Sequence, residues 1–439
     1  MGQWKRGKLH VSADGRYLQE GDKPFFWLGD TAWMMFQKLS EEEIRLYLEN
    51  RRAKGFNVIQ TVLIHSLPAK GIGDQMDSRV KNPVTKEYFE FCKRMSEMAE
   101  KMGLYVGLLP CWGSVIKNGV INLSNVDRYA GYLGETFRDL NNVIWILGGD
   151  IRGDRICEVV RKEAEILKQY NPERLMTFHP FGRTSSSLWF REESWLDFHM
   201  FQSGHRRYDQ QFLGEWDDNK AKEEFFGEDN WRYVDRDLGY GILKPTLDGE
   251  PSYEGIPQGL HDPREPYWQD NDVRRYAYWS VLAGACGHTY GHNSIMQFYE
   301  TSEGTGAYGV RETWQEALHA PGAAQLAFLK ALMSRVDWQH GSTMEHILVY
   351  GQKERYHRIA IFGGEDYVIC YTYSGDEFCL DLSGFSGESM TVWWMDPENG
   401  IFSPGGVVET GGKAVFRPLR KEHGGNDWVL LLRKTCKDD

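Results

Sequence analysis

The sequence predicts an α/β fold, a (β/α)8 barrel of the TIM type, followed by a small all-β sandwich. Three observations support this prediction. Eight short apolar runs alternate with segments of helical period up to residue 336, polar or aromatic side chains follow every run, and from residue 337 the pattern changes to short alternating strands with glycine turns. We therefore expect a barrel domain over residues 1–336 and a β-sandwich domain over residues 337–439.

Eight apolar runs define the expected barrel strands. They cover residues 25–28, 57–63, 104–109, 143–147, 175–178, 198–201, 242–247 and 287–290. Short apolar runs that alternate with longer amphipathic segments are typical of βα units around a parallel sheet. Eight such units are the number that closes a TIM barrel.

Helices are expected between these strands. Ser40 precedes three glutamates, and a side-chain oxygen followed by acids is typical of a helix start; this helix should end near Gly55. The helical period predicts further helices over residues 86–102, 125–137, 154–169, 272–285 and 323–336. The segments 184–194 and 208–224 are polar and irregular, so the positions of the fifth and sixth helices stay open.

The last hundred residues predict a β-sandwich. Alternating runs lie at residues 358–362, 367–373, 378–382, 390–394 and 428–432, and glycine-containing turns separate them. Strands at this spacing are typical of a sandwich. Both a sugar-binding module and a structural lid on the barrel fit this domain, and we favour the structural role.

Charge and aromatic content limit the expected partners. The 439 residues carry 51 Lys and Arg against 63 Asp and Glu, a net charge of −12 without long blocks of one sign. This balance gives no basic footprint for nucleic acid or a membrane surface, so neither is expected as a partner. Aromatic residues make up 14% of the chain, and flat rings with polar tips suit sugars. A neutral or polar oligosaccharide or glycoside is the expected substrate.

The cysteines and the start of the chain suggest neither disulfides nor an anchor. The seven cysteines are scattered without a C-x-x-C pair, so neither a disulfide framework nor a structural zinc site is expected. The sequence contains no run of about 18 apolar residues. We expect a cytoplasmic protein, or a periplasmic or secreted one if a signal peptide has been removed.

Polar and aromatic residues follow each expected strand, where a barrel enzyme carries its active site. In chain order these candidate site residues are Asp30, Trp33, His65, Trp112, Asp150, His179, Gln202, His205, Glu250, Tyr253, Glu254 and His292. Asp30 could bind sugar hydroxyls or fix its loop through Thr31. The sequence contains no H-E-x-x-H, no dinucleotide fingerprint and no G-x-S-x-G, so no metal site and no cofactor are expected.

Two of these residues suggest a catalytic pair. Asp150 ends the stretch Ile-Leu-Gly-Gly-Asp after the fourth strand, and Glu250 ends Leu-Asp-Gly-Glu after the seventh. Glycoside hydrolysis needs a carboxylic acid that protonates the leaving oxygen and a carboxylate that attacks the anomeric carbon, about 5 to 5.5 Å apart in retaining enzymes. We expect Asp150 to be the acid/base and Glu250 the nucleophile, with Glu254 as the rival nucleophile.

The catalytic pair needs neighbours that keep Asp150 protonated and Glu250 ionised. Desolvation by Trp33, Trp112 or Trp145 should raise the pKa of Asp150. A donor from Tyr253, His205 or His292 should keep Glu250 ionised. The hypothesis is a retaining, exo-acting glycoside hydrolase. An inactive or weak carbohydrate-binding protein on a barrel scaffold is the alternative, and protein or collagen binding through the tail is a third, less favoured one.

The motifs also resemble a known family. The stretches 26–33, 55–60, 145–150 and 248–254 are similar to the apiosidase-like hydrolases of glycoside hydrolase family 140, and residues 392–400 resemble the collagen-binding-type β-sandwich that ends those chains. The resemblance covers nearly the whole chain. It implies a (β/α)8 barrel, release of apiose from side chains of the pectin rhamnogalacturonan II, and a catalytic Asp and Glu at Asp150 and Glu250.

Overall fold

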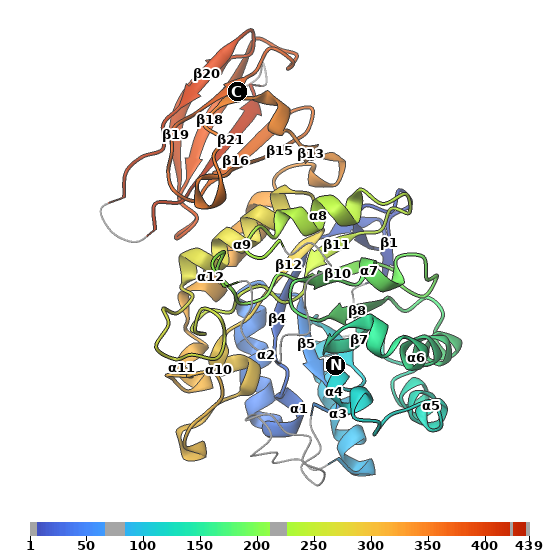
Figure 1. Ribbon diagram of the computed structural model, residues 1–439. Coiled ribbons are helices and arrows are strands. Elements are labelled where there is room, and N and C mark those ends of the chain that lie inside the picture. The colour runs from blue at the N-terminus through green and yellow to red at the C-terminus, as the bar shows by residue number, and fades with distance from the viewer. Residues whose placement is uncertain (1–6, 66–83, 211–225, 422–424, 436–439) are drawn as a thin grey trace.

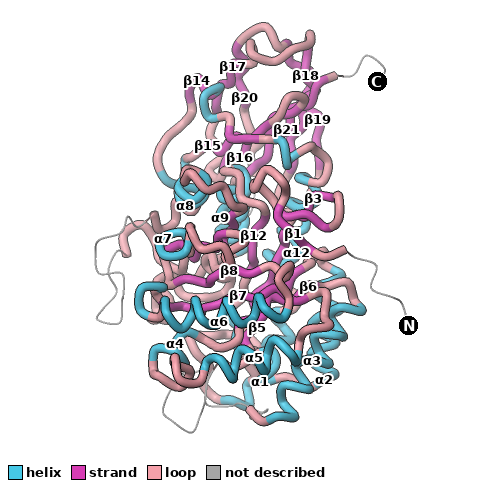
Figure 2. Tube along the Cα trace, turned by 90° about the vertical axis from the view of Figure 1, so that its right-hand side faces the viewer, coloured by secondary structure: helices cyan, strands magenta, loops and turns pink. Residues whose placement is uncertain are grey.

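The chain folds into a barrel with a β-sandwich on one side (Figure 1). The structure, a computed structural model, describes residues 7–65, 84–210, 226–421 and 425–435. In Figures 1 and 2 the sandwich lies beyond helices α8 (Trp231–Leu238), α9 (Asp270–Leu282) and α12 (Pro321–Met333) of the barrel.

The barrel sheet contains the eight predicted strands. Its order is β8-β7-β6-β5-β4-β12-β11-β10-β9. The strands are β4 (Trp27–Thr31), β5 (Val58–Val62), β6 (Tyr105–Leu109), β7 (Val143–Ile151), β8 (Met176–Pro180), β9 (Thr184–Ser185), β10 (His199–Gln202), β11 (Thr246–Asp248) and β12 (Gly287–Tyr290). All neighbours are parallel except the short β9, which pairs antiparallel with β10. Because β8 and β10 also lie against each other, the sheet is nearly closed, and the predicted barrel is confirmed.

Both faces of the barrel strands are buried, which explains their nearly continuous apolar runs. In β7, Ile144 and Ile146 point into the barrel interior, whereas Trp145 and Leu147 point to the surrounding helices. Because side chains alternate along a strand, the position of a residue in the strand decides whether its side chain points to the barrel interior or to the helices.

The six predicted helices are confirmed. They are α2 (Glu41–Ala53), α3 (Lys86–Lys101), α5 (Val126–Thr136), α6 (Cys157–Tyr170), α9 and α12. Ser40 caps α2 as expected, because its side chain accepts from the Glu43 N–H while the Glu43 side chain accepts from the Ser40 N–H. Shorter helices are α1 (Met35–Lys38), α4 (Gly113–Lys117), α10 (Asn293–Gln297) and α11 (Trp314–Ala317).

The two helices left open by the sequence are short. The fifth position holds α7 (Ser187–Phe190), and α8 begins at Trp231, after the polar segment in which the sixth helix was sought. Residues 211–225 lie outside the described residues. A helix of four or eight residues has too few turns to show a clear helical period, which is why neither was predicted.

An N-terminal antiparallel sheet, which the sequence did not predict, covers one end of the barrel. Its strands are β1 (Leu9–Val11), β2 (Leu18–Glu20) and β3 (Lys23–Phe25). The Tyr105 hydroxyl at the start of β6 donates to the Gly7 carbonyl at 2.7 Å, and the Phe25 ring meets the Tyr105 ring edge-on at 5.3 Å. This sheet closes the amino-terminal end of the barrel and leaves the other end for a site.

The C-terminal part is an all-β sandwich of two antiparallel sheets. One has the order β13-β15-β16-β21-β18-β19 and the other the order β14-β17-β20. The strands are β13 (Ser342–Thr343), β14 (Leu348–Tyr350), β15 (Ile359–Gly363), β16 (Tyr367–Thr372), β17 (Phe378–Asp381), β18 (Ser389–Met395), β19 (Phe402–Glu409), β20 (Lys413–Phe416) and β21 (Trp428–Lys434).

The five predicted strands of the sandwich are present, and four were missed. The missed β19 is an edge strand that contains Pro404, Gly405 and Gly406 and exposes most of its residues. Proline and glycine are tolerated at an edge, but they remove the alternating pattern on which strand prediction rests.

Helix α9 joins the barrel to the sandwich. The buried Arg274 guanidinium binds both oxygens of the buried Asp427 carboxylate at 2.9 and 3.0 Å. Tyr278 stacks on Tyr371, with ring centroids 4.5 Å apart and planes inclined by 8°. These contacts hold the sandwich against the barrel in a fixed position, as a structural lid would be held.

A buried glutamate in α6 predicts a pH-dependent stability. Glu163 is 1% exposed, and burial raises its pKa from the ordinary 4.5 to about 8. Because the pKa of Glu163 is higher in the folded than in the unfolded state, the free energy of unfolding falls as pH rises above 4.5. The fall is complete above a pH of about 8. Glu163→Gln should therefore raise Tm at pH 8 by a few degrees and change it little at pH 4.

The matched control is Glu165→Gln on the exposed side of the same helix, which should leave Tm unchanged at both pH values. Equal Tm values for wild type and Glu163→Gln at pH 8 would contradict the prediction. Differential scanning calorimetry makes the comparison.

Candidate active site

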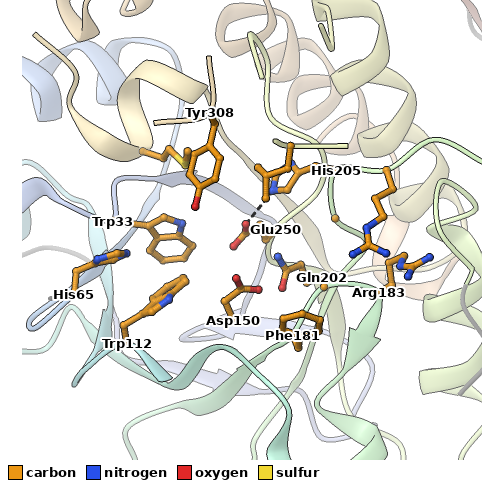
Figure 3. A pocket seen from close by; sticks show the side chains of 15 residues that line it. Trp33, His65, Trp112, Asp150, Phe181, Arg183, Gln202, His205, Glu250 and Tyr308 are labelled. Atoms are coloured by element: carbon orange, nitrogen blue, oxygen red, sulfur yellow. Dashed lines mark hydrogen bonds and ion pairs between the residues drawn. The ribbon is translucent and has the colours of Figure 1, made fainter. Parts of the chain in front are cut away.

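A pocket opens at the carboxyl ends of the barrel strands. Its empty volume, including the open mouth, is about 730 Å³. Seven of the predicted residues line it: Trp33, His65, Trp112, Asp150, Gln202, His205 and Glu250. Figure 3 shows the carboxyl groups of Asp150 and Glu250 turned toward the same space, with the two tryptophans on one side of it.

A bulge at the end of β7 presents Asp150 to the pocket. Gly148 and Gly149 have φ values of +89° and +106°, and Asp150 itself is left-handed at +49°. The pairing of β7 with β8 shifts register between Gly148 and Ile151. The two glycines are required here, since a Cβ on Gly148 would lie 2.6 Å from the His179 carbonyl oxygen.

The environment of Asp150 favours its protonated form. Asp150 is exposed to the open pocket, while protein atoms surround its carboxyl group on the other sides. Desolvation and the negative charge of Glu250 raise its pKa to about 6, although His179, His205 and a hydrogen bond with Gln202 act in the opposite direction. A carboxyl group that is protonated in weakly acidic solution can donate a proton to a leaving group.

Two histidines hold Glu250. His205 Nε2 lies 3.1 Å from Glu250 Oε1, and His179 Nε2 lies 3.1 Å from Oε2. The other ring nitrogen of each histidine faces a backbone donor, because His179 Nδ1 accepts from the Asp150 N–H and His205 Nδ1 from the Tyr253 N–H, both at 3.4 Å. These acceptor roles place a proton on each Nε2. The His205 N–H forms a hydrogen bond with Glu250, and the His179 N–H lies near the second carboxylate oxygen without the alignment of a hydrogen bond.

Glu250 is accordingly ionised. Burial alone raises its pKa, but the interactions of the carboxylate with His179 and His205 outweigh burial and lower the pKa to about 2. The sequence indicated His205 as a donor to Glu250, whereas His179 was predicted only as one of the candidate site residues. The two carboxyl groups of the pocket therefore differ in pKa by several units, in opposite directions from their ordinary values.

Aromatic rings form one wall of the pocket. The Trp33 and Trp112 rings lie 5.2 Å apart, and His65 stacks on Trp112 at 5.0 Å. Trp33 Nε1 donates to the Tyr253 hydroxyl at 3.1 Å, which orients the indole from behind. Such a wall can pack against the apolar face of a sugar ring.

Five predicted site residues do not line the pocket. His179 and Tyr253 lie behind it, against Glu250 and Trp33, whereas Asp30, Glu254 and His292 serve elsewhere. Asp30 is fully buried, and its Oδ2 atom accepts from Arg51 Nε at 2.5 Å and from the Tyr47 hydroxyl at 2.6 Å. β4 continues through Thr31, so Asp30 is a strand residue that points to α2 rather than to the pocket. It is a structural anchor, held by Arg51 and Tyr47 rather than through Thr31.

Glu254 and His292 line a different cavity. Glu254 Oε2 accepts from the Tyr290 hydroxyl at 2.6 Å and from the Gly322 N–H at 3.0 Å, and His292 Nε2 lies 3.2 Å from Glu312 Oε1. His292 is therefore not the donor to Glu250, and Glu254 is not positioned as its rival.

Trp145 is also excluded as a neighbour of Asp150. It points outward from β7 and packs edge-on against Phe137 at 5.9 Å. The alternation of side chains along β7 explains this direction.

Six pocket-lining side chains were not predicted from the sequence: Phe181, Arg183, Arg206, Leu260, Met296 and Tyr308. Phe181 and Arg183 directly follow β8, and Arg206 follows His205, so a wider window after each strand would have found them. Leu260 and Tyr308 come from long loops in which no pattern marks them. The two arginines give the pocket a basic side that net charge did not indicate.

The described parts of the chain contain no group of three His, Cys, Asp or Glu side chains arranged to hold a metal ion. Within the same ranges, no helix combines the length and apolar composition needed to cross a bilayer.

The bulge gives a testable prediction. In Gly149→Ala, the new Cβ would lie 2.7 Å from Trp112 Cε3, at a φ of +106° that alanine disfavours. We expect a stability loss of about 1–3 kcal/mol. Displacement of Asp150 should lower kcat by about 10²-fold. Chemical denaturation and steady-state kinetics measure the two effects.

Gly241→Ala is the control, because a Cβ there meets no atom within 4 Å. It should match wild type in both measurements. A Gly149→Ala protein with unchanged kcat would show that the position of Asp150 does not depend on the bulge.

Two family models match the chain. Residues 12–340 match the family model described as "Apiosidase-like, catalytic domain". The chain belongs to the apiosidase-like family. Residues 345–433 match a second model, "Putative collagen-binding domain of a collagenase". No curated relative matches the chain.

Solved structures resemble this apiosidase-like chain over nearly its full length. One titled "Glycoside hydrolase" is 39% identical with a TM-score of 0.89, covering 98% of this chain and 97% of that one. A glycoside hydrolase family 5 protein from Bacteroides vulgatus ATCC 8482 is 38% identical with a TM-score of 0.89, covering 99% and 95%. The family and these relatives identify the chain as a glycoside hydrolase.

Proposed function

We propose that this glycosidase is retaining and exo-acting, and that it removes a terminal sugar, apiose or a similar side-chain residue of plant cell walls such as those of pectin. Asp150 is the acid/base and Glu250 the nucleophile. One observation supports this proposal above all others. Two carboxyl groups with pKa values of about 6 and about 2 face one pocket.

The proposed reaction has two steps. Glu250 attacks the anomeric carbon while Asp150 gives its proton to the glycosidic oxygen, so the bond to the leaving group breaks and a glycosyl-enzyme ester forms. Water then attacks the same carbon, Asp150 takes the proton of that water, and Glu250 is released. The N–H groups of His179 and His205 keep Glu250 ionised and oriented before each cycle.

The shape of the pocket supports removal of a terminal unit. Trp33 and Trp112 form one side, Phe181 lies below Asp150 in the view of Figure 3, and Tyr308 lies across from it. A sugar enclosed on several sides is more easily a chain end than an internal unit. The apiose assignment rests on the family to which the chain belongs.

A substrate panel tests the proposal. The purified enzyme is offered 4-nitrophenyl glycosides, among them the β-D-apioside, and oligosaccharides released from pectin. The first-formed anomer of the product is followed by proton NMR. Release of a single sugar with retained configuration is the expected result. Initial formation of the opposite anomer would overturn the retaining mechanism, and release of internal fragments would overturn the exo action.

A further inference from the structure

His205 contacts Glu250 from a position beyond the end of its strand. β10 ends at Gln202, and Gly204, at a φ of +80°, turns the chain away from the strand direction. His205 therefore lies outside the ladder of the barrel sheet. Contacts with other segments decide where its backbone is held and, through the backbone, where its ring lies.

Trp268 makes one of these contacts. Its indole Nε1 donates to the His205 carbonyl oxygen at 3.0 Å, and the same oxygen accepts from the Gly259 N–H at 2.7 Å. The Trp268 side chain is buried, 63 residues after His205 in the chain. At the other end of the histidine, Nε2 lies 3.1 Å from Glu250 Oε1. A single residue therefore connects this indole to the proposed nucleophile.

The backbone of Trp268 fixes the loop that carries the second donor. The Trp268 N–H donates to the Ile256 carbonyl, and the Trp268 carbonyl accepts from the Gly255 N–H, both at 3.0 Å. Gly259 lies in the turn between these paired segments. Trp268 therefore holds His205 directly through its ring and indirectly through this loop, and only the direct contact depends on the side chain.

The indole of Trp268 belongs to a shell of rings around a buried cation. Arg275 of α9 is fully buried, and its guanidinium carbon lies 4.7 to 5.9 Å from the centroids of five rings. The rings are those of Trp268, Tyr276 and Trp279 from the barrel and Tyr356 and Tyr373 from the sandwich. A cation attracts the faces of aromatic rings, so it holds the shell together.

A buried ion pair closes this shell. Arg275 Nη2 lies 2.7 Å from Glu228 Oε2, and the other Glu228 oxygen accepts from the Tyr356 hydroxyl at 2.8 Å. Both charged side chains are fully buried. Close packing around a paired charge leaves little freedom for the rings. The indole is thus held firmly, as a side chain that positions another must be.

We propose that Trp268 is a positioning residue of the reaction: its indole N–H holds the His205 carbonyl, and His205 in turn holds the Glu250 carboxylate in the attacking orientation. The inference rests on the proposed function in one respect, the role of Glu250 as the nucleophile. It gives a part in catalysis to a side chain that lies outside the catalytic pocket.

Trp268→Phe tests the proposal, because phenylalanine keeps an apolar ring but has no N–H. Loss of the hydrogen bond should let His205 shift relative to Glu250, although the Gly259 N–H still binds the carbonyl. We expect kcat to fall about tenfold and KM to change less than about twofold. Steady-state kinetics with the 4-nitrophenyl glycoside that wild type cleaves fastest measure both constants.

The pH profile separates positioning from a general loss of structure. Burial raises the pKa of Glu250, but His179 and His205 lower it from the ordinary 4.5 to about 2. A displaced His205 lets this pKa rise, so kcat/KM of Trp268→Phe should begin its acid-side decline at a higher pH than wild type. Four titratable side chains interact with the Glu250 carboxylate: Asp150, His179, His205 and Tyr253.

Trp279→Phe is the matched control. Trp279 is equally buried and lies 4.9 Å from the same guanidinium, but its Nε1 has no hydrogen-bond partner in the described parts of the chain. Both variants should lose a few degrees of Tm. Only Trp268→Phe should lose kcat and shift the acid-side decline. Wild-type kcat in Trp268→Phe, or equal losses of kcat in the two variants, would overturn the proposal.

A double-mutant cycle tests whether Trp268 acts through His205. In a His205→Ala background the contact with Glu250 is already lost, so adding Trp268→Phe should lower kcat no further. Equal fold-losses of kcat in the wild-type and the His205→Ala backgrounds would mean that Trp268 acts by another route, and they would overturn the proposal.

A crystal structure of Trp268→Phe separates this proposal from the proposed function. His205 Nε2 should lie beyond hydrogen-bonding distance of Glu250, or its ring should occupy two conformations, whether or not a substrate is known. A displaced His205 together with a wild type that cleaves no glycoside would remove the proposed activity alone. An undisturbed His205 in a variant with wild-type kinetics would remove the positioning role alone.

Discussion

Replacing Glu250 by glutamine is expected to lower kcat by about 10⁴-fold or more, as loss of a covalent nucleophile does in other enzymes. The amide has no negative charge with which to attack the anomeric carbon. Its shape is nearly that of the carboxylate, and His179 and His205 can still approach it, so Tm should change little. Steady-state kinetics with an aryl glycoside and a thermal melt measure the two effects.

The matched control is Glu254→Gln, a glutamate four residues later that does not line the catalytic pocket. It should retain kcat, although loss of charge toward Tyr290 and Gly322 should lower its Tm. A Glu254→Gln enzyme as inactive as Glu250→Gln would reassign the nucleophile.

Azide tests the role of Glu250 directly. With Glu250→Ala, azide should enter the space left by the side chain and give a glycosyl azide of inverted configuration, which NMR identifies. A retaining mechanism predicts this rescue, because the small anion replaces the missing nucleophile. Recovery of only the free sugar would indicate that Glu250 acts through water.

Replacing Asp150 by asparagine should lower kcat/KM by about 10²- to 10⁴-fold for substrates with poor leaving groups. The loss should be much smaller for 2,4-dinitrophenyl glycosides in the first step, because that leaving group departs without a proton. Comparing the two substrate types separates proton donation from a general loss of structure.

The pH profile provides the second readout. Asp150 must be protonated to donate, so activity should fall as pH rises through about 6, and Glu250 must be ionised, so activity should persist on the acid side down to about pH 2 wherever the fold is stable. In Asp150→Asn the alkaline decline near pH 6 should disappear.

Asp248→Asn is a demanding control for this profile. Burial also raises the pKa of Asp248 to about 6, but its carboxylate is bound by Ser203 and Asn230 and does not line the catalytic pocket. The decline near pH 6 should remain in this variant. If the decline instead survived in Asp150→Asn and disappeared in Asp248→Asn, the titrating acid would be Asp248 and not Asp150.

The sequence predicted the barrel well because its signals are local. Each apolar run and each helical segment can be recognised within a short stretch of sequence. The topology of a parallel barrel then brings the carboxyl ends of all strands to one face. That is why Asp150 and Glu250, a hundred positions apart, could be expected to meet. The Gly-Gly step before Asp150 was informative because only such a step allows the bulge.

The failures have equally specific causes. The first strand was ended at residue 28, three residues early, so Asp30 was taken for a loop residue, whereas in β4 it points to Arg51. The approach of His179 Nε2 to within 3.1 Å of Glu250 was not predicted, because it depends on how the ends of β8 and β11 meet, which no local pattern records. The arginines that line the cavity between the barrel and the sandwich could not be predicted as a cluster, because Arg183, Arg232 and Arg355 lie in separate segments of two domains and a whole-chain charge count hides them.

The joint at α9 limits how this architecture can be recombined. Exchanging the sandwich for an unrelated module would leave the Arg274 charge without Asp427 and the Tyr278 ring without Tyr371. Arg274 would keep its ion pair with Asp270 at 2.8 Å, but loss of one carboxylate partner leaves its buried charge only partly compensated, which is destabilising. Chimeric enzymes built from this barrel should therefore keep α9 together with the sandwich sheet that it contacts.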